Sequence, residues 1–168
     1  VFEIPVSEPK GTTEVDRLSD VVGAPMVDAT LMCAASYQGR VLCISAEDGH
    51  TVWTRPVDAV SGPVTDGSYV YVTASDGALY AFDHDTGTPA WTNSEYRWRS
   101  VSAPVVTSGG LAFGDYDGIV SFLDPTTGRT VARPAPVSVR RFLTTAERFF
   151  KPMRANSCSC GLRCRKTL

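Results

Sequence analysis

The chain has 168 residues, of which 43% are hydrophobic, and its formal net charge is −2. This length and composition suit one compact soluble domain with a hydrophobic core. No stretch approaches the roughly 18 uninterrupted apolar residues that a membrane helix needs, and Val1–Pro5 has neither a basic leader nor the apolar core of a signal peptide. We therefore expect no membrane helix and no export signal in this sequence.

Charge is divided unevenly along the chain. Residues 1–133 contain 17 acidic and 8 basic side chains, whereas residues 134–168 contain 1 acidic and 8 basic side chains. Three of the five cysteines also lie in the second part. The change falls near Pro134, where a proline-containing stretch marks a boundary between regions. We therefore treat residues 1–133 and the tail separately.

A repeat of about forty residues runs through residues 17–133. The first 16 residues precede it and are expected to hold the end of an earlier unit, with an outer strand at Val1–Ser7, and the loop that follows. Three sets of residues keep one register, 38 and then 41 residues apart: Pro25, Pro63 and Pro104; Gly39, Gly77 and Gly118; and Gly49, Gly87 and Gly128.

Each repeat unit contains short apolar runs, typical of strands, that are separated by turn residues. A pair such as Asp76-Gly77 supplies the positive φ of a tight hairpin, and Trp53 and Trp91 follow the second glycine of their units by four residues. The runs lie at 31–35 and 41–44, at 69–73 and 79–82, and at 111–113 and 120–123. This pattern indicates about four strands per unit, which is the blade of a β-propeller.

The predicted fold is therefore all-β: a partial β-propeller with three blades, at roughly 17–55, 56–93 and 97–133. Three blades form an arc, not a closed ring. Because one blade cannot bury its own faces, we expect the free arc to expose apolar faces.

The segment Ala81–Trp91 carries the pattern Ala-x-Asp-x-x-Thr-Gly-x-x-x-Trp, which resembles the repeats of the pyrroloquinoline-quinone enzyme propellers. In those proteins the tryptophan docks each blade against its neighbour. The third repeat has Ala132 in the tryptophan position, and the first has Ser45 in the aspartate position. Such departures are typical of non-enzymatic relatives.

Two further segments resemble the BamB family of outer-membrane assembly lipoproteins. They are Thr12–Val21, which leads to the blade-opening Pro25, and Ser102–Val106, which leads to Asp117-Gly118. The resemblance covers residues 1–133 and implies three blades of an eight-bladed ring. It also implies a periplasmic protein held at the outer membrane by a lipid anchor in the N-terminal region that this sequence lacks.

The resemblance implies a scaffold that binds the periplasmic POTRA domains of BamA and has no catalytic, cofactor or metal site. An acidic position of the family that contacts BamA matches Asp20, and a second acid two residues further on is replaced by Val22. Asp16 and Arg17 lie in the same segment, so the three charged residues form a candidate partner-binding patch. The alternative is an exposed loop whose charges make only local turn and ion-pair contacts.

A fragment of a quinone-dependent dehydrogenase is the alternative function. That family uses a calcium ion, a catalytic aspartate and a disulfide between adjacent cysteines, whereas Cys33 and Cys43 are ten residues apart. We expect both cysteines to be small buried strand residues. His50 and His84 are expected in turns without metal-ligand partners.

The segment Tyr96–Arg99 combines two aromatic and two basic residues between the second and third blades. We predict an interblade strand whose tryptophan packs and whose arginines pair with acids; contact with a protein or peptide is the alternative. The acidic body around this segment disfavours nucleic acid.

The tail 134–168 lacks the repeat. Its eight basic residues would suit an anionic membrane surface or nucleic acid, and Cys158, Cys160 and Cys164 supply only three metal ligands at an unusual spacing. The abrupt change favours an aberrant or disordered tail.

Overall fold

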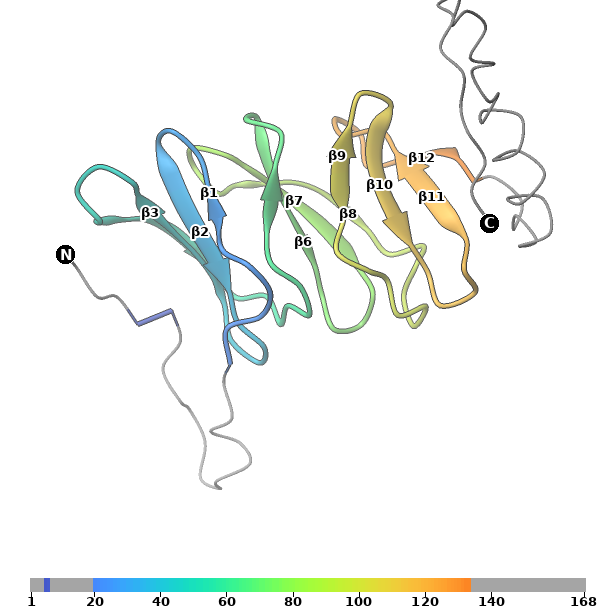
Figure 1. Cartoon of the computed structure of the whole chain (residues 1–168), viewed down its shortest axis with the longest axis horizontal. Helices are drawn as coiled ribbons and strands as arrows, with labels where there is room; N and C mark the ends of the chain where they lie inside the picture. The colour runs from blue at the N-terminus through green and yellow to red at the C-terminus, as the bar shows by residue number, and fades with distance from the viewer. Residues whose placement is uncertain (1–4, 7–19, 134–168) are drawn as a thin grey trace, which may run out of the picture. The chain divides into compact units, whose positions relative to one another are not determined.

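The computed structural model describes residues 5–6 and 20–133, and its strands form three four-stranded antiparallel sheets in chain order (Figure 1). The prediction of an all-β chain of four-stranded units is confirmed. Within these residues no helix is long and apolar enough to cross a membrane.

Blade 1 contains β1 (Met26–Val27), β2 (Leu31–Ala35), β3 (Val41–Ser45) and β4 (Thr51–Arg55). Blade 2 contains β5 (Val64–Thr65), β6 (Tyr69–Thr73), β7 (Leu79–Asp83) and β8 (Pro89–Asn93). Blade 3 contains β9 (Val105–Thr107), β10 (Gly110–Gly114), β11 (Val120–Leu123) and β12 (Thr130–Ala132).

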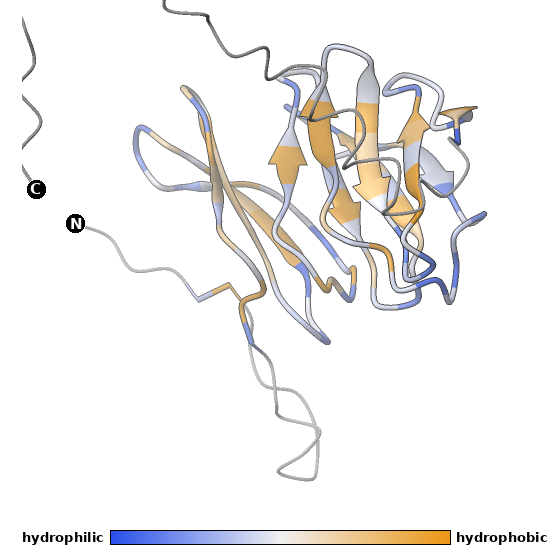
Figure 2. Ribbon diagram, turned by 45° about the vertical axis from the view of Figure 1, so that its right-hand side comes forward, coloured by the Kyte–Doolittle hydropathy of each residue, from blue (hydrophilic) through white to orange (hydrophobic). Residues whose placement is uncertain are grey.

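One row of residues crosses each sheet and faces the next blade. The register aligns the row across all four strands of a blade. The rows are Met26, Cys33, Cys43 and Trp53 in blade 1, and Val64, Tyr71, Ala81 and Trp91 in blade 2. Buried members of the first row join a cluster with side chains of blade 2, and members of the second row join a cluster with side chains of blade 3. The hydrophobic core therefore lies between blades. In Figure 2 the hydrophobic residues, drawn in orange, lie mainly on the strands.

The corresponding row of blade 3 consists of Val105, Ala112, Phe122 and Ala132. Val105 is 59% exposed, whereas the equivalent Met26 of blade 1 is 9% exposed. Within the described residues, Val105 and Ala132 of this row are exposed, and Ala112 and Phe122 are half-buried. The row has the composition of an interblade surface, with alanine in place of the docking tryptophan.

Trp53 joins blade 1 to blade 2. Its indole N–H donates a hydrogen bond to the carbonyl of His84 at 2.9 Å, and its ring lies on Gly87, where an added Cβ would come within 2.4 Å of the indole. Gly87 also has a φ of +64°, a backbone conformation that favours glycine. Arg55 adds a second bond, from its Nε to the Gly87 carbonyl at 2.5 Å. The tryptophan of blade 1 therefore packs directly on Gly87, the repeat glycine of blade 2.

Trp91 joins blade 2 to blade 3 in the same way. Its indole N–H donates to the carbonyl of Pro125 at 2.8 Å, and Gly128 lies under the ring, with 2.4 Å left for a Cβ. The amide of Asn93, which occupies the position of Arg55 in the repeat, donates to the Gly128 carbonyl at 2.7 Å. Both contacts therefore use a tryptophan on a glycine and two hydrogen bonds to backbone carbonyls. The tryptophan and the glycine are also residues that mark the repeat in the sequence.

A disulfide joins Cys33 and Cys43, which the sequence predicts only as small buried residues. The two residues face each other across β2 and β3, their Cα atoms are 4.1 Å apart, and both are fully buried. The bridge lies in the row that faces blade 2, beside Trp53. It therefore links the two central strands of blade 1 at the interblade core.

Candidate protein-binding site

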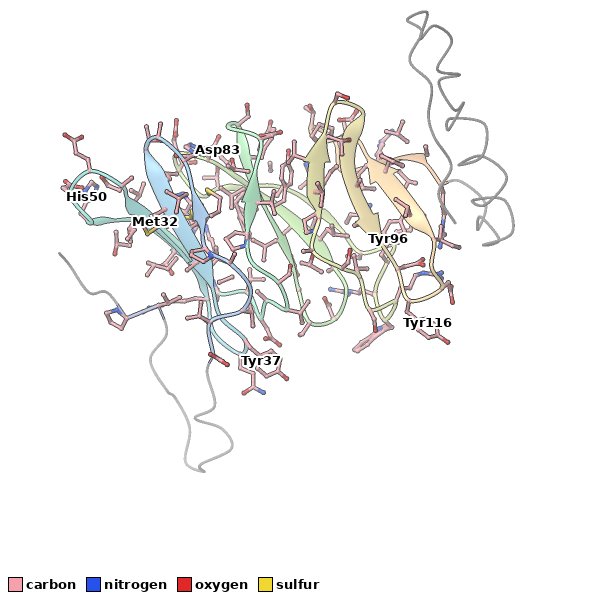
Figure 3. The ribbon with its side chains drawn as sticks, in the orientation of Figure 1. Met32, Tyr37, His50, Asp83, Tyr96 and Tyr116 are labelled. Carbon is pink, nitrogen blue, oxygen red and sulfur yellow. A yellow bond between two sulfur atoms is a disulfide. The ribbon has the colours of Figure 1, made fainter. Side chains whose placement is uncertain are left out.

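Several turns lie at one edge of the three sheets, where edge means the side at which the strands end and not an outer strand. They include the turn at Asp76-Gly77 and the aromatic and basic segment Tyr96–Arg99. Because strand order within each blade is sequential and antiparallel, the turn between the second and third strands lies at the same edge as the connection to the next blade. We call this edge the loop rim and define it as residues 20, 36–40, 56–63, 74–78, 94–104 and 115–119. Figure 3 shows Tyr37 and Tyr116 at this edge, whereas His50 and Asp83 lie at the opposite edge.

Asp20 lies on the loop rim and is exposed. Its carbonyl accepts a hydrogen bond from the backbone N–H of Tyr37 at 2.8 Å, and the next residue, Val21, forms a β-bridge with Ser36. This pairing fixes the backbone of Asp20 beside the first turn of the rim. Asp16 and Arg17, the other members of the predicted patch, lie outside the described residues.

Val22, the replacement for the second acid of the family pattern, does not belong to this surface. Its side chain is partly buried and packs against the core between blades 1 and 2, and its backbone N–H donates to the carbonyl of Ala35 at 2.9 Å. Val22 therefore contributes to the core and adds no charge to the candidate patch. The patch consists of Asp16, Arg17 and Asp20 alone.

The connection between blades 1 and 2 is fixed by Asp58. The carboxylate accepts bonds from the backbone N–H of Gln38 at 2.6 Å and from the hydroxyl of Ser75 at 2.5 Å, so it joins the turns of both blades. Gln38, and not Gly39, takes the positive φ of the first turn, at 51°. The bond from Gln38 to Asp58 holds the glutamine in this conformation.

The connection between blades 2 and 3 carries the aromatic and basic segment. Arg97 Nε lies 2.8 Å from Asp76 Oδ2, and Arg99 Nη2 lies 2.9 Å from Asp115 Oδ2. The prediction that these arginines pair with acids is confirmed. The prediction that Trp98 packs is wrong, because 84% of its surface is exposed; Tyr96 takes the interior position instead, with no exposed surface.

Asp115 is the electrostatic centre of this part of the rim. Its side chain has no exposed surface and contacts the guanidinium groups of Arg99 and Arg133, and its Oδ1 accepts the backbone N–H of Ile119 at 3.0 Å. Burial alone would raise the pKa of the Asp115 carboxyl, but these hydrogen bonds and charges together lower it below its usual value. The aspartate is therefore a buried carboxylate that organises the turn between β10 and β11.

His84 has partners that the sequence analysis missed. It is 8% exposed, its Nε2 lies 2.7 Å from Asp28 Oδ2 in blade 1, and its Nδ1 lies 2.7 Å from Asp85 Oδ1. The expected position of His84 in a turn is confirmed, but its two carboxylate partners were not predicted. The 38-residue register relates Asp28 to Asp66, and each of these acids uses one oxygen to accept backbone N–H groups of its own turn. This shared local role does not indicate that His84 is a partner of Asp28.

The interblade pair of His84 and Asp28 predicts a pH dependence of stability. Burial alone would lower the pKa of His84, but hydrogen bonds to Asp85 and Asp28 raise it above 6.5. For a group whose pKa is raised by folding, the stabilisation is complete below the pKa of the unfolded chain and is lost as pH rises through the folded value. The free energy of unfolding is therefore expected to fall as pH rises from about 6.5, the usual pKa of histidine, through the raised pKa of His84, as measured by urea denaturation.

The variant His84→Gln should remove this fall, because glutamine does not titrate. His50→Gln is the matched control, since His50 lies in the equivalent turn of blade 1 and pairs with Asp48 only at an exposed site, where its side chain is 63% accessible. A pH dependence that persists in His84→Gln would show that another group controls it.

In the part of the chain that the structure describes, no three His, Cys, Asp or Glu side chains are placed to hold a metal ion. What this part offers is a rim of ordered turns that carry charged and aromatic side chains. The arrangement suits contact with a protein surface.

The comparisons with known proteins agree on one family. The sequence profile of outer membrane protein assembly factor BamB matches residues 1–93 and 70–141. The BamB of Burkholderia pseudomallei (strain K96243) is 36% identical over 132 residues, which are 79% of this chain and 35% of that protein. This chain therefore spans about a third of the length of such relatives.

Solved structures show the same relationship. The crystal structure of BamB from Moraxella catarrhalis superposes with a TM-score of 0.74 and 29% identity, over 79% of this chain and 40% of that chain. The quinohemoprotein alcohol dehydrogenase from Comamonas testosteroni shares the fold, with a TM-score of 0.58 and 24% identity, over 68% of this chain and 21% of that chain. The profile match, the identity to the relatives and the propeller blades together show that this chain belongs to the BamB family of outer membrane protein assembly factors.

Proposed function

We propose that this chain is part of a non-enzymatic scaffold of the outer-membrane β-barrel assembly machinery, and that its loop rim binds the periplasmic POTRA domains of BamA. Family membership is the observation that carries the proposal, because the relatives are named as assembly factors. The exposed Asp20, fixed beside Tyr37, supports the assignment of the contact to the rim. Asp16 and Arg17 are proposed to complete it.

A periplasmic location, associated with the outer membrane, is part of the same proposal. The disulfide between Cys33 and Cys43 supports it independently, since disulfides persist in oxidising compartments such as the periplasm and are rare in the cytosol. Membrane attachment is assigned to the lipid anchor that the family carries in its N-terminal region.

The alternative, a fragment of a quinone-dependent dehydrogenase, is less well supported. The fold is shared, but the cysteines of this chain pair across two strands, ten residues apart, whereas the dehydrogenase pattern needs adjacent cysteines. A dye-reduction assay with added quinone and calcium tests this alternative, and activity that depends on both would overturn the scaffold assignment.

The variant Asp20→Arg tests the contact with BamA. We expect binding of the 168-residue chain to the BamA periplasmic domains to weaken at least about fivefold, mainly through slower association, with an effect that shrinks at high salt. Surface plasmon resonance measures both rates. Glu47→Arg is the matched control, because Glu47 is an exposed acid at the opposite edge of the same blade. Equal weakening in both variants would show a general charge effect without a local contact.

A further inference from the structure

Trp98 and Tyr116 form an aromatic patch on the loop rim. Their exposed fractions, 84% and 80%, are the two largest among the large hydrophobic side chains of the described residues. The backbone N–H of Tyr116 donates to the carbonyl of Arg99 at 3.0 Å, so Tyr116 lies beside the residue that follows Trp98. Single exposed hydrophobic residues need no explanation, but here two highly exposed aromatic residues are carried by backbone segments that are hydrogen-bonded to each other.

The segment that carries Trp98 is anchored on both sides. Before it, the buried Tyr96 contacts the ring of Phe113 at a centroid distance of 4.7 Å and bonds Thr130 Oγ1 through its hydroxyl at 2.8 Å. After it, the Arg99 guanidinium is bound by the buried Asp115. The segment that carries Trp98 is therefore held in place by the residues on both sides of it.

The backbone of Trp98 is itself fixed in an unfavourable conformation. Its φ is +64°, in the left-handed region that favours glycine and is unfavourable for other residues. Its N–H donates to the carbonyl of Asp76 at 2.7 Å, and Gly77 packs beneath the segment, where a Cβ would lie 2.7 Å from the Tyr96 carbonyl. Conformations of this kind persist where surrounding contacts enforce them, and they concentrate at functional sites. Here the result is a fixed backbone that carries an exposed indole.

The patch protrudes, so its partner must supply the cavity. A folded protein can hold a preformed apolar pocket for an indole, whereas an unfolded segment would have to order one. Tryptophan, tyrosine and arginine are the residues most enriched at binding hot spots, and rigid presentation lowers the entropic cost of association. The loop rim as defined contains six acidic and three basic side chains, which favours a partner surface with basic residues and disfavours anionic lipid.

We infer that Trp98 and Tyr116 are a docking point of the loop rim, separate from the Asp20 patch, that inserts into an apolar pocket with a basic border on a folded partner. The inference rests on the proposed function, because the Asp20 patch lies on the same rim, and the probe is therefore the BamA periplasmic domains.

The experiment measures the affinity of the 168-residue chain for these domains. Trp98→Ala should weaken binding at least about tenfold, and Trp98→Phe should recover most of the loss. Trp98→Gly removes the indole while relieving the backbone, so this variant should melt at the wild-type temperature or above it and still bind poorly. Val52→Ala, an exposed apolar position on β4, is the control and should bind as wild type.

The outcomes separate this inference from the proposed function. If Asp20→Arg weakens binding and Trp98→Ala does not, the aromatic docking point is refuted and the proposed function stands. If the wild-type chain does not bind the domains, both are refuted. Co-sedimentation with phosphatidylcholine vesicles that requires Trp98 would replace the protein partner with a lipid surface.

Discussion

Replacing Trp53 with alanine is expected to lower the free energy of unfolding by about 3–5 kcal/mol. Trp53 is 6% exposed, fills the core between blades 1 and 2, and bonds the carbonyl of His84. Alanine would leave a cavity and an unpaired carbonyl at the blade interface. Urea denaturation followed by circular dichroism measures the loss. Trp91→Ala should cost less, because Trp91 is only partly buried.

A double-mutant cycle with Gly87 tests the proposed packing directly. Gly87→Ala alone should destabilise the chain both through its positive φ, at about 1–2 kcal/mol, and through collision of the new Cβ with the indole. In the Trp53→Ala background the collision disappears, so only the backbone cost should remain. Additive effects in this cycle would show that Trp53 does not pack on Gly87 in solution.

Asp115→Ala is expected to lower the free energy of unfolding by about 1.5–3 kcal/mol. The change removes the buried carboxylate that Arg133 and the backbone N–H of Ile119 share, and it leaves Arg99 paired with Asp117. Asp117→Ala is the control, because Asp117 is 45% exposed in its side chain and pairs only with Arg99; it should change the free energy by about 0.5 kcal/mol or less.

The pH dependence of this loss has a definite sign. Folding lowers the pKa of Asp115, so its stabilisation is complete above the pKa of the unfolded chain and disappears as pH falls through the folded value. The difference between wild type and Asp115→Ala should therefore shrink in acid. A constant difference from neutral to strongly acidic pH would show that Asp115 acts through packing alone.

The architecture was predictable from the sequence because the repeat residues are the interblade contacts. Glycine is required at positions 87 and 128 because a tryptophan of the preceding blade lies on each. The regular distance between these residues in the sequence therefore reflects the regular stacking of the blades. The disulfide was also accessible in principle. In a hairpin centred on Gln38, residues equally distant from the centre face each other, which pairs Cys33 with Cys43.

Contacts between the turns of different blades were not predictable from periodicity. The pairing of His84 with Asp28 joins residues 56 positions apart, and which turn side chains meet depends on how the sheets stack. The exposure of Trp98 has a similar cause. Tryptophan usually packs, and only the competition with Tyr96 for the interior position, together with a positive φ, turns it outward.

The tryptophan contacts also set an order of events as the chain emerges. The hydrogen-bond acceptor of Trp53 lies 31 residues after it, and that of Trp91 lies 34 residues after it. Whether the chain emerges from a ribosome or from a translocation channel, each blade therefore keeps its apolar row uncovered until the turn before the fourth strand of its successor has followed. A pause before residues 87 and 128 have emerged would prolong the exposed state, so this is where a chaperone would bind the emerging chain.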